Sequence, residues 1–164
     1  GHRLIHGASE TCALPHGHNE LVTVRLAATA PARLDGQGNM AIPFQQAKGT
    51  WHRFVDEKLD HALQLADDDP LLGWFLTHEP TRARRVVVTP GDPTTELMAC
   101  LLMAKINAFL KNEGGILHCT ELSLQETPTN TVCFSGDPED FIPRTSSTHT
   151  PWWQRADMSI SDLP

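Results

Sequence analysis

The segment of residues 92–125 constrains the fold of this 164-residue chain more than any other part of it. Asp92 and Pro93 predict the start of a helix, because aspartate is a good N-cap and proline suits the first helical position. The apolar segment that follows continues to residue 112 and ends at Gly114–Gly115, where glycine is typical of a helix end. Two strands are then predicted at residues 116–125 and 131–135, with residues 126–130 between them.

The residues before this segment add one strand and one further helix. Residues 20–30 alternate well enough for a strand, with Val22 and Val24 on one face. Apolar residues recur at helical spacing from Gln45 to His61, which is typical of an amphipathic helix. Short strands are predicted at residues 40–44 and 86–88, within an otherwise irregular connection over residues 66–92. This order indicates an α+β domain with two helices on one face of an antiparallel sheet, whose free edges favour oligomerisation.

One domain is predicted over residues 1–136, followed by a C-terminal arm or tail over residues 137–164. The tail is rich in proline, serine and threonine and contains Trp152 and Trp153. It is either an arm packed on another subunit or a loose end, and the two tryptophans favour the arm.

Charge and cysteine content exclude several classes of protein. Thirteen basic residues stand against 20 acidic ones, a net charge of −7, which argues against nucleic acid or an anionic membrane as the main partner. The longest strongly apolar run, Leu97–Ala104, is far shorter than the roughly 20 residues of a membrane-spanning helix, and no secretory leader is visible. Four cysteines without a CxxC pair suit a reducing cytoplasm. Three of them, Cys100, Cys119 and Cys133, are interpreted as small buried hydrophobic residues.

A His-Gly-His sequence is the strongest indication of a metal site. His16 and His18 point to the same side of an extended segment, so both can reach one ion. A third nitrogen has to come from elsewhere, and His2 is the best candidate, with His6 in reserve. Three histidines with an open fourth position are typical of a catalytic zinc. The alternative is a chance pattern in a chain with nine histidines.

Three further positions can carry acid–base chemistry. Cys12 lies four residues before His16, where a thiolate beside a metal can act as base or nucleophile; otherwise it is a small buried residue. Asp60 can orient His61 for proton transfer, but only if the helix ends there, because neighbours on a regular helix do not face each other. Glu126 follows a strand, where it either binds a guanidine-like ring edge or is a solvated strand end.

The order of these motifs resembles one protein family. The motifs are His2-Arg3-Leu4, Cys12, HGHN at residues 16–19, LDH at 59–61, DPTTE at 92–96 and ETPT at 126–129. Together they are similar to the 6-pyruvoyl-tetrahydropterin synthase and 6-carboxy-5,6,7,8-tetrahydropterin synthase family, over roughly residues 2–135.

The resemblance implies a zinc-dependent lyase of the tunnelling fold (T-fold) that acts on 7,8-dihydroneopterin triphosphate. By position, the zinc ligands are His2, His16 and His18, the base is Cys12, the supporting dyad is Asp60 and His61, and the pterin contacts are Glu126 and Thr127. Family members form homohexamers, as dimers of trimers that close the sheet into a barrel, with the site between subunits. Candidates for the triphosphate in the sequence itself are Arg3, Lys105 and the cluster of Arg82, Arg84 and Arg85, although a solvated face suits the cluster better.

The long connection after residue 66 looks more like the carboxy branch, which releases acetaldehyde and serves queuosine biosynthesis. Two alternatives stay open: the pyruvoyl branch, and a non-catalytic homologue that only binds a pterin. The family has a strand before its His-Arg-Leu motif, and because this sequence begins at Gly1 that strand is either missing from the sequence or absent from the protein. The chain departs from the family in Pro43 at a usual aspartate and in residues 64–66, where an asparagine is common.

Overall fold

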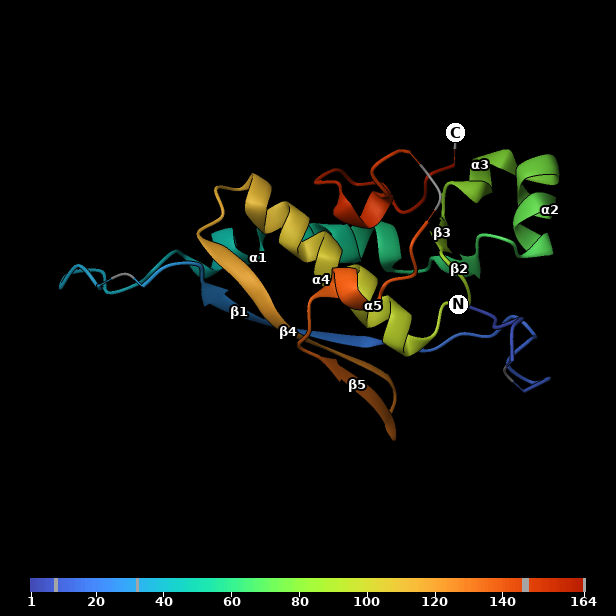
Figure 1. The fold of residues 1–164 in the computed structure, drawn as a ribbon, viewed down its shortest axis with the longest axis horizontal. Coiled ribbons are helices and arrows are strands. Elements are labelled where there is room, and N and C mark those ends of the chain that lie inside the picture. The colour runs from blue at the N-terminus through green and yellow to red at the C-terminus, as the bar shows by residue number, and fades with distance from the viewer. Residues whose placement is uncertain (8, 32, 146–147, 164) are drawn as a thin grey trace.

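A three-stranded antiparallel sheet carries the 18-residue helix α4 on one face (Figure 1). The computed structural model describes residues 1–7, 9–31, 33–145 and 148–163. In chain order the elements are β1 (Leu21–Ala28), α1 (Phe44–Phe54), a π-helical turn (Val55–Leu59), β2 (Leu63–Ala66), α2 (Pro70–His78), α3 (Pro80–Ala83), β3 (Val86–Thr89), α4 (Thr95–Asn112), β4 (Leu117–Thr127), β5 (Asn130–Phe134), α5 (Pro138–Phe141) and a short 3-10 turn (Trp152–Gln154). The predicted α+β class with an antiparallel sheet and few helices is confirmed.

The main sheet has the strand order β1-β4-β5. Val24 of β1 lies opposite Leu122 of β4, and Leu122 lies opposite Phe134 of β5. Strand alternation places Leu122 and Leu124 on the same face, where both are fully buried in the core cluster that includes α4. The register of β4 against β5 shifts between Gln125 and Thr127, next to Glu126.

Helix α4 ends as predicted but begins later than predicted. Gly114 and Gly115 take positive φ angles of 107° and 65°, the conformation that glycine permits at a helix end. The N-cap, however, is Thr94, whose hydroxyl accepts a hydrogen bond from the Leu97 N–H. The predicted start at Asp92 is therefore wrong, because the Asp92 carboxylate accepts hydrogen bonds from the N-terminal segment instead.

Two other expectations fail between β1 and α4. Residues 40–44 form no strand, because helix α1 already begins at Phe44. Its N-cap residue is Pro43, which makes no side-chain capping hydrogen bond. The connection over residues 66–92 contains α2 and α3, and its strand β3 pairs in parallel with β2. The domain thus has a second, parallel sheet beside the predicted antiparallel one. In Figure 1 the loop between β1 and α1 projects from one end of the molecule.

The tail packs on its own chain. Trp152 and Trp153 are only 1% and 5% exposed and belong to the same core cluster as Phe54 and Phe109. The Lys105 ammonium donates hydrogen bonds to the Trp152 carbonyl at 2.9 Å and to the Arg155 carbonyl at 2.8 Å. The two tryptophans therefore do not indicate an arm reaching to another subunit. The domain boundary at residue 136 stays a prediction.

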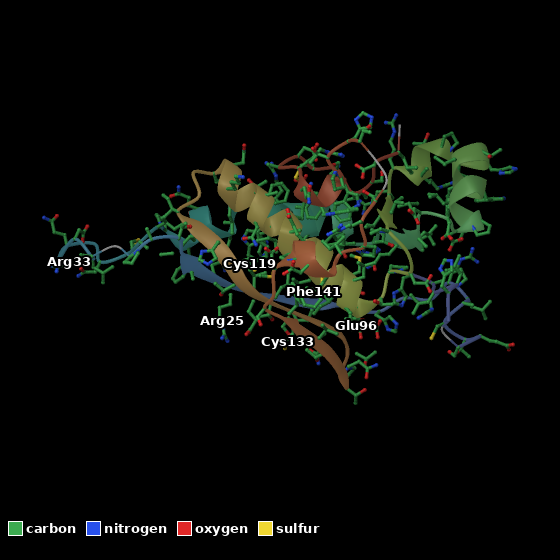
Figure 2. The ribbon with its side chains drawn as sticks, in the orientation of Figure 1. Arg25, Arg33, Glu96, Cys119, Cys133 and Phe141 are labelled. Atoms are coloured by element: carbon green, nitrogen blue, oxygen red, sulfur yellow. The ribbon has the colours of Figure 1, made fainter. Side chains whose placement is uncertain are left out.

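The cysteines outside the N-terminal segment differ in exposure. Cys100 and Cys119 are buried as expected, and burial raises the pKa of Cys119 to about 11. Cys133 is exposed on β5, so its expected burial is wrong (Figure 2). No helix among the described residues is long and apolar enough to cross a membrane.

Candidate metal centre and adjoining cavity

Three histidines of the N-terminal segment meet at one point. One ring nitrogen from each of His2, His16 and His18 lies within 4.8 Å of the other two. An antiparallel bridge joins His2 to His16, with the His2 N–H 2.8 Å from the His16 carbonyl and the reverse bond at 3.0 Å. The spacing of His16 and His18 brings both rings to the same side, and His2 is the third member as the sequence suggested.

Backbone carbonyls fix the tautomers of two of these rings. The Nδ1 atom of His2 lies 3.2 Å from the Pro93 carbonyl, and that of His16 lies 2.8 Å from the Leu14 carbonyl. Because a carbonyl oxygen only accepts, each Nδ1 carries the proton. The two Nε2 atoms, 3.0 Å apart, then face each other with lone pairs in the neutral rings. A cation between them relieves this repulsion, so the donor set fits a zinc ion, which histidine nitrogens bind at ~2.0–2.1 Å.

The surroundings of His2 favour the neutral ring that a metal requires. Burial, followed by the neighbouring His16, lowers the pKa of His2. Glu126 reaches the same place from β4, with Oε1 3.8 Å from the His2 Nε2 and 3.0 Å from the Thr95 hydroxyl that donates to it. Glu126 is therefore next to the histidine cluster and is not a solvated strand end.

Thr127 has a local role in the β4–β5 turn. Its hydroxyl accepts a hydrogen bond from the Asn130 N–H at 3.1 Å. Thr127 is not among the residues that line the cavity beside the histidines, whereas Glu126 lines a separate cavity with residues of the α4 N-terminus.

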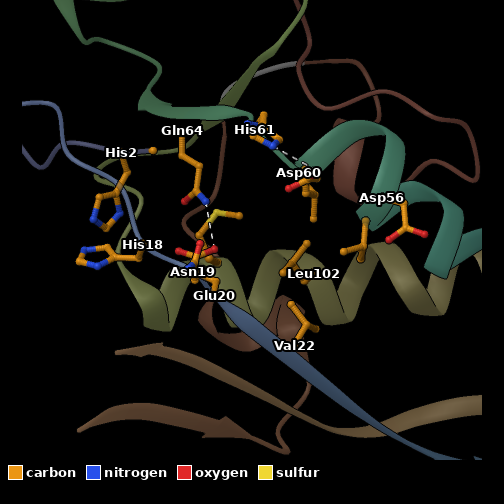
Figure 3. A pocket seen from close by; sticks show the side chains of 14 residues that line it. His2, His18, Asn19, Glu20, Val22, Asp56, Asp60, His61, Gln64 and Leu102 are labelled. Carbon is orange, nitrogen blue, oxygen red and sulfur yellow. Dashed lines mark hydrogen bonds and ion pairs between the residues drawn. The ribbon is translucent and has the colours of Figure 1, made fainter. Parts of the chain in front are cut away.

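A cavity of about 420 Å³ opens beside the histidines. In the view of Figure 3, His2 and His18 lie on one side of it, and Asp56 and Asp60 lie on the other. Its lining contains carboxylates, imidazoles and an apolar floor, and it has no lysine or arginine. The residues are Gly1, His2, His18, Asn19, Glu20, Val22, Val55, Asp56, Leu59, Asp60, His61, Gln64, Met98 and Leu102.

Asp60 and His61 lie where the helix ends, which is the condition under which the two side chains can face each other. The π-helical turn ends at Leu59, Asp60 takes an extended conformation, and His61 takes a left-handed one with φ 58°. This break turns the two side chains toward each other, with His61 Nε2 3.6 Å from Asp60 Oδ2. Arg85 fastens the end of the turn by donating to the Glu57 carbonyl at 2.6 Å and to the Asp60 carbonyl. Both members remain exposed at the cavity rim, at 88% and 68% for His61 and Asp60.

Glu20 and Gln64 line the cavity, although no sequence pattern gives a reason to place them in a site. Glu20 follows the HGHN motif directly, and burial, as the largest effect, raises its pKa. Gln64 of β2 is only 8% exposed and donates from Nε2 to the Glu20 carboxylate at 3.3 Å. Glu20 marks the expected start of a strand in the sequence, and nothing in its local pattern signals burial.

Cys12 and His6 lie outside the cavity lining. Cys12 is partly buried, and its sulfur accepts a hydrogen bond from the Ser9 hydroxyl at 3.2 Å. His6, the reserve ligand, faces two carboxylates instead, with Nδ1 3.0 Å from Asp92 and Nε2 3.1 Å from Asp68. His6 is therefore not part of the described histidine cluster.

Two of the cations suggested for a triphosphate are engaged elsewhere. Arg3 binds the Asp69 carboxylate with two nitrogens. Lys105 is fully buried beneath the tail. Neither side chain faces the cavity beside the histidines.

Comparison with known proteins identifies relatives of this chain. The family model described as 6-pyruvoyl tetrahydropterin synthase matches residues 1–137. A protein of Rickettsia felis named 6-carboxy-5,6,7,8-tetrahydropterin synthase is 30% identical, with 82% of this chain and 89% of the relative covered. A protein of Rickettsia bellii with the same name is 31% identical over the same shares. Among solved structures, an uncharacterized protein of Wolinella succinogenes, WS1659, has the same fold, with a TM-score of 0.65, 22% identity and coverage of 82% and 91%.

Proposed function

Because this chain belongs to the 6-pyruvoyl tetrahydropterin synthase family, we propose that it is a zinc-dependent lyase of the carboxy branch. Its substrate is 7,8-dihydroneopterin triphosphate, and its products are 6-carboxy-5,6,7,8-tetrahydropterin, acetaldehyde and triphosphate, a step toward queuosine in the cytoplasm. The observation that carries the proposal is the 3.0 Å approach of the Nε2 atoms of His2 and His16, beside a cavity that Asp60 and His61 also line. The names of the Rickettsia relatives support the carboxy branch over the pyruvoyl branch.

His2, His16 and His18 hold the zinc, and the Nδ1 bonds to carbonyls keep the first two rings in the ligating tautomer. A bound zinc stabilises the negative charge that develops on side-chain oxygens of the substrate. Asp60 orients His61, which exchanges a proton with the substrate at the cavity rim.

Three residues outside the cavity complete the proposed site. Glu126 accepts hydrogen bonds from the amino-pyrimidine edge of the pterin, with Thr127 alongside. Cys12 is the proton-abstracting base. Because Cys12 does not line the cavity of the single chain, we assign its role to the assembled protein, a homohexamer built as a dimer of trimers with the site between subunits.

The test is incubation of the zinc-loaded protein with 7,8-dihydroneopterin triphosphate, followed by mass spectrometry of the products. We expect a 6-carboxy pterin and acetaldehyde in equal amounts. A pyruvoyl product moves the protein to the sister branch. No turnover by a zinc-replete hexamer, together with retained pterin binding, makes it a binding-only homologue.

Metal-free protein and His16→Ala are the controls that should lose activity. His118→Ala is the matched control that should keep it. His118 is an exposed histidine on β4 that belongs to no described metal cluster. Zinc content, measured by atomic absorption beside the product assay, separates loss of metal from loss of chemistry.

A further inference from the structure

Glu20 and Gln64 form a polar pair on the cavity wall that the proposed mechanism does not use. Glu20 precedes β1 and Gln64 belongs to β2, so the pair joins two different sheets of the fold. The Gln64 Nε2 lies 3.3 Å from Glu20 Oε2. Since a carboxylate only accepts hydrogen bonds, this contact fixes the orientation of the amide, with nitrogen toward Glu20 and oxygen turned away. Figure 3 shows the oxygen on the side of the cavity that holds His2 and His18.

The Gln64 oxygen has no partner. It is the one buried side-chain polar atom in the described part of the chain for which no hydrogen bond is found. Buried polar atoms in native proteins are nearly always paired, so an orphaned one beside a cavity is satisfied by water or by a ligand that occupies the cavity. The group that satisfies a carbonyl oxygen has to be a donor.

The rest of the lining requires the same kind of ligand. Glu20, Asp56 and Asp60 bring three carboxylates to the cavity, and no lysine or arginine lines it. A phosphate group in this cavity therefore meets carboxylates without a compensating side-chain cation. A neutral group rich in hydroxyls, in contrast, donates hydrogen bonds to these acceptors and adds no negative charge to the cavity.

The positions of Gln64 and Glu126 relative to the histidines indicate which part of the ligand occupies the cavity. Gln64 forms a parallel backbone bridge with His2, and both residues line the cavity. Glu126, the proposed partner of the pterin ring, reaches the cluster from β4, whereas β2 belongs to the other sheet. The cavity beside Gln64, which Glu126 does not line, is thus left for the substituent that the ring carries.

We propose that Glu20 and Gln64 accept hydrogen bonds from the hydroxyl groups of the substrate's side chain and select for a polyhydroxylated substituent. The inference rests on the proposed function, because that function supplies a pterin with such a side chain. It also assigns the phosphorylated end of the substrate to a place outside this cavity.

The experiment compares two ligands that differ only in the side chain: 7,8-dihydroneopterin, which has hydroxyls and no phosphate, and 6-methyl-7,8-dihydropterin, which has none. Binding is measured by anaerobic titration calorimetry on the assembled protein, zinc-loaded and metal-free. The metal-free arm removes any contact between hydroxyls and metal. We expect the wild type to prefer the hydroxylated ligand in both arms, and Gln64→Leu to reduce that preference about fivefold, as expected for one lost hydrogen bond.

The second variant is Glu20→Gln, which keeps the shape and removes the charge. It should also reduce the preference for the hydroxylated ligand while binding of the methyl ligand stays the same. Gln46→Leu and Glu10→Gln change exposed residues of the same types and serve as matched controls. Zinc content is measured for every variant.

The outcomes separate this inference from the proposed function. If the wild type binds both pterins and neither variant changes the preference, the inference is overturned and the proposed function stands. An equal loss of both ligands places the contact on the ring, which also overturns it. If the zinc-loaded wild type binds neither pterin, the proposed function fails, and the inference fails with it.

Discussion

Arg3 and Asp69, 66 residues apart, form a forked ion pair that fastens the N-terminal segment to the start of α2. The Arg3 Nε lies 2.7 Å from Asp69 Oδ2, and a second guanidinium nitrogen binds Oδ1. Asp69 is fully buried, and it also caps α2 by accepting from the Leu71 N–H at 2.7 Å. Since His2 is the neighbour of Arg3, the same contact holds one proposed zinc ligand in place.

Asp69→Asn should therefore weaken both the fold and the metal site. We expect the free energy of unfolding to fall by about 2–4 kcal/mol, because the change leaves a partly buried arginine without its partner. Zinc affinity should fall as well. The matched control is Arg82→Ala, which breaks an exposed pair with Glu79 and should cost at most ~0.5 kcal/mol. Urea denaturation and a zinc competition assay measure the two effects. Equal results for both variants would contradict the assigned role of the pair.

The same carboxylate predicts a dependence of stability on pH. Burial on its own raises the pKa of Asp69, but hydrogen bonds from Arg3 and from the Leu71 N–H outweigh it, so the pKa lies below its usual value. A carboxyl whose pKa is lowered by folding adds stability above its unfolded pKa of ~3.9, and that stability is lost as the pH falls through the folded pKa. Below pH ~4 the urea midpoint of the wild type should fall more steeply than that of Asp69→Asn. Parallel profiles would exclude this contribution.

Removal of metal should act on stability through the histidine cluster. In the metal-free protein the Nε2 atoms of His2 and His16 face each other at 3.0 Å without a cation. Chelation of zinc should lower the melting temperature of the wild type, because a ligand that binds only the folded state stabilises it. The chelator should have no effect on His16→Ala. The same shift in both proteins would place the metal elsewhere.

The role of His61 in the dyad with Asp60 can be tested by a substitution that keeps the backbone conformation at residue 61. His61 has a left-handed conformation, which asparagine tolerates better than most other residues, so His61→Asn removes the imidazole with little strain. We expect kcat to fall by about 10²–10⁴, with zinc content and melting temperature unchanged. Asp56→Asn changes another carboxylate of the same cavity and should have a much smaller effect. Unchanged kcat in His61→Asn would remove His61 from the chemistry.

The sequence predicted those elements whose signal is local. Helical spacing and the two glycines gave the body and the end of α4, and strand alternation gave the main sheet. The start of α4 shows the limit of such signals, because Asp-Pro occurs three times. Asp137-Pro138 caps the short helix α5. Asp69-Pro70 caps α2, where no helix was predicted, whereas Asp92-Pro93 lies before the Thr94 cap. The difference between these Asp-Pro sequences comes from tertiary contacts, because the Asp92 carboxylate accepts hydrogen bonds from the backbone N–H groups of Ile5 and His6.

In the candidate site, too, the residues with a local sequence signal could be predicted and the others could not. Two of the three clustered histidines share one short motif, and the condition on Asp60 and His61 could be stated from the helix geometry alone. Glu20 and Gln64 could not be found, because their pairing depends on how β1 and β2 meet. A buried glutamate after a histidine motif has the same sequence pattern as a solvated one.

The packing of the tail depends on Lys105. Lys105 is fully buried, its ammonium binds the carbonyls of Trp152 and Arg155 and the Asp157 carboxylate, and it lies over three aromatic rings. Lys105→Met keeps an unbranched side chain that is only one atom shorter but leaves those oxygens without their donor. The free energy of unfolding should therefore fall by about 2–4 kcal/mol. Limited proteolysis should then cut within residues 148–163 much faster than in wild type. Lys111→Met changes an exposed lysine of the same helix and should leave the cleavage rate unchanged. If Lys105→Met is as resistant as this control, the tail is held by its tryptophans alone.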